Sequence, residues 1–334
     1  MRFKNIFFAA AAAMALTACS SDDEQSFVSQ FPEDGVMRFT TNLVDPTAVT
    51  TRASITGSDV NQNGQQFLVK IVNPTSATYS YFNTVQYDGS EWTPVNRMLW
   101  QNDQQSITVT AAYKQGKTFS DYDFIAGANL TVAADQSTEA KLKQQDLLTM
   151  PTKTIANPSI EETLMQNGKL VINFYHALTK LDVTLDLNDE FYPANIQASD
   201  ITEFTIKGTN AGYQFKAMET ANENYGTVTV TASTAADILA NQYNFTAGTA
   251  ESKHSTAKYE AIIVPQTIAA GQLTVSFKIG TRSFSWTNTT AYTLEQGKQY
   301  TLPLTVGKDG VTAGSRAFTV SSWENQPGDN LGTE

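Results

Sequence analysis

Cysteine and histidine are scarce in this chain of 334 residues, which contains one cysteine and two histidines. A single cysteine excludes an intramolecular disulfide and any zinc or iron–sulfur site that needs several thiolates. The G-x-S-x-G, P-loop and G-x-G-x-x-G motifs are missing as well. We therefore expect a protein that is not an enzyme and that holds no metal ion and no other cofactor.

Charged residues are few, and most of them are acidic. They make up 16% of the chain, against about 25% in an average globular protein. The 22 Lys and Arg are outnumbered by 33 Asp and Glu, so the net charge is −11. Such a chain repels phosphate backbones, and no basic stripe runs along it, which argues against a nucleic-acid partner.

Long helical periodicities are also lacking, whereas residues that favour strands are abundant. The chain contains 45 Thr, 18 Phe and 13 Tyr, and these residue types fit a pleated, half-buried surface. Short alternating segments separated by turn residues predict an all-β protein with antiparallel sandwiches, one in each half. Short helical connections are expected at 137–148 and 234–241.

The N-terminus has the pattern of an export signal. Arg2 and Lys4 precede a short apolar run, and the segment ends at Leu16-Thr17-Ala18-Cys19, which resembles a bacterial lipoprotein box. We predict a signal peptide at 1–18 and lipidation of Cys19, whose acyl chains would anchor the protein in outer-membrane lipid. The alternative is an ordinary secretory signal with an incidental cysteine.

Polar residues separate the remaining parts of the chain. The segment 19–36 begins with an acidic run that resembles the surface-export signal of Bacteroidetes lipoproteins, and it is expected to be a tether. The polar stretch 156–168 is the candidate domain boundary. We therefore expect an N-terminal sandwich at 37–165, with its first strand in 37–52, and a C-terminal sandwich at 166–334.

Several segments, taken in order, resemble the fimbrillin family of Bacteroidetes, the Mfa-like or FimA-like pilins. Besides the lipoprotein box they are TTRA at 50–53, ITVTAAY at 107–113, DLL at 146–148, FYHAL at 174–178, IVPQ at 263–266 and GKQY at 297–300. The resemblance implies two transthyretin-like β-sandwiches. It also implies a surface lipoprotein that joins other pilin subunits in type V pili and serves cell adhesion, by strand exchange after an arginine-directed protease has cut the chain.

The resemblance assigns roles to particular residues of this sequence. Arg52 becomes the candidate cleavage site, and Arg38 is the second choice because it lies within the expected strand, where paired backbone resists proteases. The candidate exchanged strand presents Met37, Phe39, Thr41 and Leu43 on one face. The end of the chain is either a donated strand or an ordinary last strand, with Phe318, Val320 and Trp323 as its apolar positions.

Other interpretations of the same residues stay open. If Arg52 is only a surface arginine, the first strand is permanent and the protein is an anchored lipoprotein, either a pilus anchor or tip subunit or a binder of glycans. Aromatic rings bind sugars, and Trp92, beside the Asp88-Gly89 turn, is the tryptophan expected to be exposed. The host or microbial surface ligand is not identified by any motif.

The remaining polar motifs are expected to be structural. Asp59 begins an EF-hand-like D-x-N-x-N-G run, but Lys70 stands where the loop needs a bidentate glutamate, so a polar turn is expected. His176 is expected to be a hydrogen-bonded core residue. Lys180, Asp182, Thr184 and Asp186 alternate with apolar residues, which predicts that they form the solvent-facing side of a sheet.

Overall fold

The computed structural model describes residues 31–43, 55–161, 163–220, 225–231, 235–313 and 318–323, and strands dominate these ranges. The first strands along the chain are β1 (Phe39–Leu43), β2 (Gln66–Asn73), β3 (Ser76–Tyr87), β4 (Trp92–Pro94), β5 (Ile107–Tyr113), β6 (Ala128–Thr131), β7 (Leu148–Ile155), β8 (Met165–Gln166) and β9 (Lys169–His176). Short helices connect them: α1 (Gly57–Val60), α2 (Asp121–Ala126) and α3 (Glu139–Lys143).

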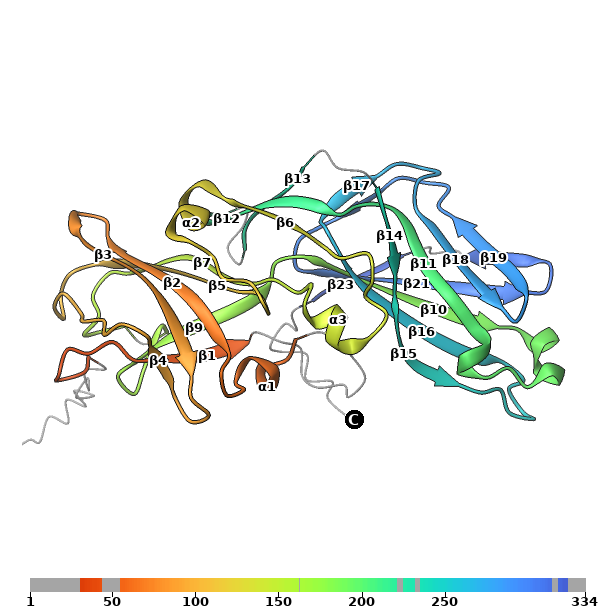
Figure 1. Ribbon diagram of the computed structural model, residues 1–334, viewed down its shortest axis with the longest axis horizontal. Helices are drawn as coiled ribbons and strands as arrows, with labels where there is room; N and C mark the ends of the chain where they lie inside the picture. Colours follow the sequence, from red (N-terminus) through yellow and green to blue (C-terminus); the bar gives the residue numbers. More distant parts are fainter. Residues whose placement is uncertain are drawn as a thin grey trace, which may run out of the picture.

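Strands also make up most of the second half (Figure 1). They are β10 (Thr179–Leu187), β11 (Ile201–Asn210), β12 (Gly212–Thr220), β13 (Gly226–Val230), β14 (Ala235–Leu239), β15 (Asn241–Thr246), β16 (Ser255–Ile263), β17 (Gln266–Ile268), β18 (Thr274–Ile279), β19 (Arg282–Thr287), β20 (Tyr292–Leu294), β21 (Lys298–Gly307), β22 (Gly310–Ala313) and β23 (Thr319–Ser322). The 3-10 helices η1 (Asp189–Ala194) and η2 (Ala198–Asp200) lie between β10 and β11.

The first half is a closed barrel and not the expected open sandwich. Seven of the strands that the structure describes follow one another in the order β1-β4-β3-β2-β5-β7-β9, and β1 pairs with β9 to close the ring. The pairing of β1 with β9 is parallel, so the prediction of a purely antiparallel half is wrong as well. Closure is favourable because it pairs the edge of β9, which would otherwise present a row of unpaired backbone groups.

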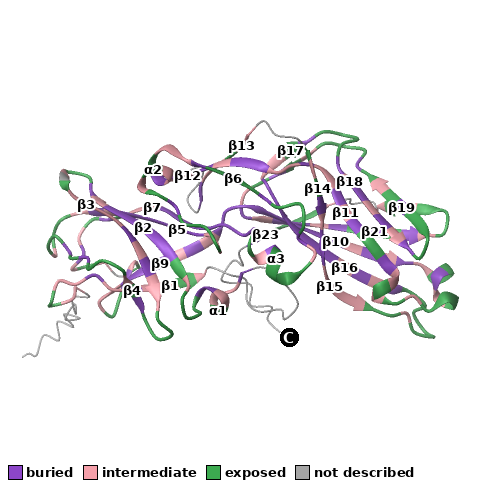
Figure 2. Cartoon of the chain, viewed as in Figure 1, coloured by how far each residue is buried: buried purple, intermediate pink, exposed green. Residues whose placement is uncertain are grey.

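The barrel has apolar side chains on both faces of some strands. Phe67, Val69 and Ile71 of β2 belong to the core inside the barrel. Leu68 of the same strand and Ala112 of β5 belong to a second core, which extends into the other half of the molecule. Buried positions therefore run through the strands of both halves (Figure 2).

The second half is organised around a sheet that we call the β10 sheet, with the order β15-β16-β10-β21-β22 and β23 also paired with β21. Its apolar face shares a core with the four-stranded sheet β14-β11-β18-β19. Within the β10 sheet, β10 and β21 are parallel from Lys180 and Gln299 to Leu187 and Val306. The expectation of antiparallel sheets therefore fails at β10 and β21, whereas β10 and β16 pair antiparallel as expected.

The two halves are joined by more than one crossing of the chain. The chain leaves the barrel after His176 and enters the β10 sheet at Thr179. A second link is the pairing of β6 from the first half with β12 from the second, visible along the top of Figure 1. The proposed domain division at residue 165 stays a prediction.

The expected helix at 234–241 is wrong. Ala235–Leu239 is strand β14, which pairs antiparallel with β11. An isolated helix of this length is marginal in water, so pairing with a neighbouring strand decides the local structure.

A close backbone approach near the end of β11 requires glycine at position 208. Gly208 has a φ of +87°, and a Cβ atom on it would lie 1.9 Å from the carbonyl oxygen of Gln272. Gly271 also has a positive φ, of +81°, but a Cβ atom there would have no neighbour within 4 Å. A side chain at either position would strain the backbone, but only a side chain at position 208 would also clash with a neighbour.

We predict that Gly271→Ala lowers the free energy of unfolding by about 1–2 kcal/mol, the cost of a left-handed conformation. Gly208→Ala should lose this amount plus about 1–3 kcal/mol, because Gln272 must also move. Urea unfolding of the two variants measures the difference. Equal losses would show that the contact with Gln272 imposes no constraint.

Candidate functional site

The candidate site is the strand that closes the barrel together with the segment that precedes it. Val36 forms a bridge with Leu99, and the N–H of Met37 donates to the carbonyl of Met98 over 3.0 Å. From Phe39 to Leu43 the strand runs beside β9, where its partners are Leu170 to Phe174. The predicted strand at 37–43 is therefore present, with β1 itself beginning at Phe39.

The four side chains predicted for one face of this strand are not equally buried. Met37 and Phe39 are fully buried in the barrel core, whereas Thr41 and Leu43 are half-buried. The ring of Phe39 lies 6.0 Å from that of Phe67, which in turn lies 5.5 Å from Phe174. The apolar side chains that fix this segment in the barrel core are therefore those at its start, Met37 and Phe39.

The other edge of β1 is held mainly by side chains. Its pairing with β4 consists of the single pair Phe39 and Trp92. Asn61 supports this seam, because its Oδ1 accepts hydrogen bonds from the Thr41 hydroxyl and from the Trp92 indole N–H, each 2.8 Å long. A groove of about 370 Å³ lies along the seam, between residues 36–39 and 91–95.

Trp92 is therefore not the exposed aromatic that the sequence predicts. Only 5% of it is exposed, and its ring lies 4.9 Å from Phe67 and 5.2 Å from Tyr87. The prediction of exposure is wrong because the strand after the turn at Asp88 and Gly89 pairs with β3 and β1, and Trp92 packs in the barrel core. No platform for a sugar ring remains at this position.

Arg38 lies in paired backbone, as expected for the second-choice cleavage site. Its carbonyl accepts a hydrogen bond of 2.8 Å from the N–H of Leu170. Its guanidinium forms an ion pair of 2.6 Å with Asp34. Hydrogen bonds from Arg38 and from the N–H of Val36 hold the pKa of the Asp34 carboxyl below its usual range.

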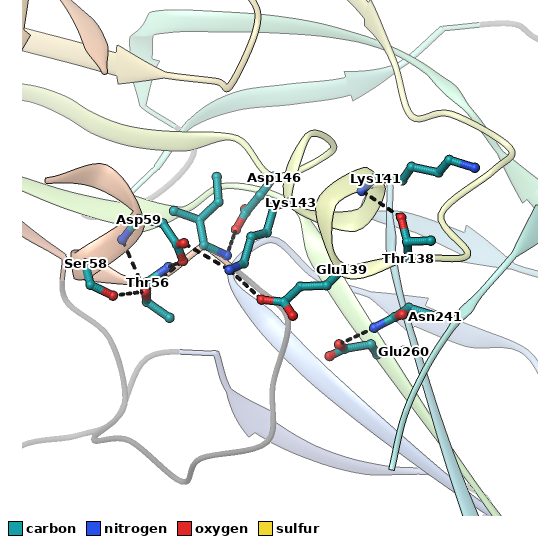
Figure 3. A network of polar contacts seen from close by, with 11 residues as sticks. Thr56, Ser58, Asp59, Thr138, Glu139, Lys141, Lys143, Asp146, Asn241 and Glu260 are labelled. Atoms are coloured by element: carbon teal, nitrogen blue, oxygen red, sulfur yellow. Dashed lines mark hydrogen bonds and ion pairs between the residues drawn. The ribbon is translucent and has the colours of Figure 1, made fainter. Parts of the chain in front are cut away.

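Two residues of the predicted site, Cys19 and Arg52, lie outside the described residues. The chain on the far side of Arg52 is well anchored from Ile55 onwards. Ile55 is buried, and its N–H donates to Asp146 Oδ2 over 3.3 Å. Thr56 and Asp59 then form a reciprocal capping box at the start of α1, with the contacts drawn in Figure 3.

Asp59 has a structural role here, in the cap of α1. Its carboxylate accepts hydrogen bonds from Thr56 and forms an ion pair with Lys143, whose Nζ lies 2.9 Å from Oδ1. Burial opposes ionisation of Asp59, but the hydrogen bonds from Lys143 and Thr56 outweigh it and lower its pKa. Over the part of the chain that the structure describes, no group of three or more His, Cys, Asp or Glu side chains could hold a metal ion.

Asp146 connects the segment after Arg52 with the other end of the chain. Besides Ile55 it contacts His176 Nδ1, at 2.9 Å, and both side chains are fully buried. The imidazole of His176 stacks on Trp323, with centroids 4.2 Å apart and an interplanar angle of 5°. The expectation that His176 is a hydrogen-bonded core residue is confirmed, but its contact with Trp323 had no signal in the sequence.

The C-terminal strand is paired within its own sheet. β23 lies antiparallel to β21, with Thr319 opposite Thr301 and Ser322 opposite Lys298. Trp323 is buried, and its N–H donates to the carbonyl of Gly297 over 2.8 Å. Of the other predicted positions, Phe318 packs on Tyr292 and Val320 is 56% exposed.

Helices in the described ranges are short. None of them combines the length and the apolar character that a helix needs to cross a membrane. Neither the Asn61 contacts nor the parallel partner of β1 has a signal in the sequence, because both depend on residues far away along the chain.

Comparison with known proteins gave a family and a set of similar structures. Residues 51–323 match the profile of the family described as Fimbrillin-like. Comparison with curated protein sequences gave no match.

Two solved structures share the fold at low sequence identity. A candidate cell adhesion protein from Bacteroides uniformis aligns with a TM-score of 0.57 and 17% identity, over 87% of this chain and 99% of that one. A candidate cell adhesion protein from Bacteroides ovatus aligns with a TM-score of 0.59 and 15% identity, over 87% and 98%. A third match is weaker: a fimbrial protein from Bacteroides vulgatus aligns with a TM-score of 0.48 and 14% identity, over 86% of this chain and 99% of that one.

We predict that Trp323→Ala lowers the free energy of unfolding by about 3–5 kcal/mol, because it removes a buried ring and the stack on His176. Val320→Ala, on the same strand but exposed, should stay within about 0.5 kcal/mol of the parent. Urea unfolding measures both. Hydrogen exchange of the β21 amides should rise in the first variant only, and unchanged exchange there would contradict a role of Trp323 in holding β23.

Proposed function

Because the chain belongs to the Fimbrillin-like family, we propose that it is a pilin subunit that is assembled into fimbriae by exchange of a β-strand and serves cell adhesion. The observation that carries the proposal is the position of β1, which closes the barrel by pairing with β9. We propose further that the subunit reaches the cell surface as an outer-membrane lipoprotein through Cys19. In this role the protein catalyses no reaction and needs no cofactor.

Removal of β1 would leave a vacancy that a strand from another subunit fits. The edge of β9 from Leu170 to Phe174 would lose its backbone partners. The core would lose the side chains of Met37 and Phe39, both fully buried. An incoming strand restores the backbone pairing, and apolar side chains at alternate positions restore the packing and set the register.

The contacts on either side of Arg52 support a cut at this residue. Ile55 and the capping box at Thr56 stay attached to the body through Asp146 and Lys143. β1 is held on the β4 side by one backbone pair and the Asn61 contacts. A cut at Arg52 by an arginine-directed protease thus separates an anchored body from a strand with one weakly paired edge, and the acylated Cys19 leaves with that strand.

β9 provides a physical link between the vacated groove and the end of the chain. Residues 170–174 of this strand pair with β1, and its last residue, His176, stacks on Trp323. We propose that the loss of β1 loosens this contact and with it the pairing of β23. In the uncut chain, Phe318, Val320 and Trp323 act as the last strand of their own sheet.

The glycan-binding alternative has lost its main support, since Trp92 lies in the barrel core. A pilus anchor or tip subunit remains the second candidate, because either could keep β1 permanently. Digestion of the full chain distinguishes these roles from a polymerising subunit.

We predict that an arginine-specific protease cuts the purified full chain after Arg52 and that oligomers follow. Arg52→Lys should resist the protease and stay monomeric, whereas the matched variant Arg38→Lys should be cut and assemble like the parent. N-terminal sequencing and size-exclusion chromatography measure the two steps. A chain that is cut after Arg52 and remains monomeric would contradict strand exchange.

A synthetic peptide with the sequence of residues 36–43 should block assembly of the cut protein, because it refills the groove beside β9. The same peptide with aspartate in place of Phe39 should not block it, since a carboxylate cannot enter the core without a partner. Light scattering after protease treatment follows the effect. Equal inhibition by both peptides would show that the groove is not the assembly site.

A further inference from the structure

A group of charged side chains is buried on the side of the β10 sheet that the sequence predicts to face solvent. In β10, Lys180 and Asp182 lie on one face because they are two residues apart. Asp182 is directly opposite Glu260 of β16 in the antiparallel pair. Lys180 and Glu260 are fully buried and Asp182 is 4% exposed, so the expectation of a solvated face is wrong for this part of the strand.

Lys180 and Glu260 are in direct contact. The Nζ of Lys180 lies 2.5 Å from Glu260 Oε2, and neither side chain is accessible to solvent. An ammonium and a carboxylate lose their hydration in such a place. Joining the two groups in an amide would remove both charges from the interior.

The groups around the contact can assist a reaction between these two side chains. Asn241 donates its amide N–H to Glu260 Oε1 over 3.2 Å, as Figure 3 shows. Asp182, across from Glu260, accepts a hydrogen bond from the side chain of Gln299. The site therefore contains a nucleophile, an acyl group, a donor to the acyl oxygen and a second carboxylate.

We propose that Lys180 and Glu260 form an intramolecular amide bond. The Nζ amine attacks Cδ of Glu260, while the Asn241 N–H stabilises the charge that develops on Oε1. The new C–N bond forms as the bond from Cδ to Oε2 breaks. Asp182 relays two protons from Nζ to the leaving oxygen Oε2, one before and one after the attack, so one water molecule departs and no oxidant or reductant is needed.

Such a bond would tie β10 to β16 and close the chain between residues 180 and 260 into a covalent loop. Cross-links of this kind restrict the unfolded chain and prevent the two strands from separating under load. The reaction depends on the folded β10 sheet alone. It is thus independent of cleavage at Arg52 and of strand exchange.

Peptide mapping of the purified full chain tests the proposal. Trypsin does not cut after an amidated lysine, so the peptide 170–207 should be recovered joined to the peptide 259–278. Its mass should be the sum of the two peptides less one water molecule. Recovery of 170–180 and 259–278 as free peptides in most of the protein would overturn the proposal.

The same digest contains a matched control. Lys278 and Glu203 are also 2.5 Å apart, but their side chains are 38% and 65% exposed. This pair should remain unlinked, because water stabilises both charges. A joined species at Lys278 in the same amount would show that contact alone, and not burial, determines the linkage.

Variants separate the roles of the groups around the bond. Lys180→Met keeps the length of the side chain without a nucleophile, and its digest should contain 259–278 only as a free peptide. Asp182→Asn keeps the shape but cannot relay the proton, so the joined species should fall at least several-fold. An unchanged yield of the joined peptides in Asp182→Asn would show that Asp182 does not take part in the reaction. Whether the bond exists is decided by the digest of the parent protein.

Discussion

The parallel pairing of β1 with β9 is the contact on which the organisation of the first half depends. A strand is inserted between β4 and β9, and this single insertion turns an open sheet into a barrel with a filled core. The inserted strand and the residues just before it also supply two of the buried side chains, Phe39 and Met37. One short segment near the start of the chain therefore completes both the hydrogen bonding and the packing of the barrel.

β9 connects β1 to the rest of the molecule. It pairs with β1 along one edge and with β7 and β8 along the other. Its last residue, His176, touches both Asp146 and Trp323, the last residue that the structure describes. The segment that follows Arg52 reaches the same place through Ile55. The beginning, the middle and the end of the described chain thus meet where the barrel joins the β10 sheet. These contacts link the position of β1 to the packing of Trp323.

The fold and the site could be predicted from the sequence only in part. Alternation at Met37 and Phe39 correctly indicated a strand with one buried face, because the period of two is a local property. The same reasoning failed for Lys180 and Asp182, which alternate with apolar residues but are covered by other parts of the chain. The prediction that Trp92 is exposed failed for the same reason. The residues near Trp92 in the sequence do not show that its ring packs in the barrel core.

Three properties can be read from the amino-acid sequence: the chain is built from strands, certain residues share a face of each strand, and the chain resembles a particular family. These properties follow from side-chain type and spacing over a few residues. The parallel pairing of β1 with β9, the closure of the barrel and the contact of Lys180 with Glu260 became visible in the folded molecule alone. Strand pairing uses backbone groups that are common to all residues, so the partner of a strand is set by packing between segments far apart in the chain.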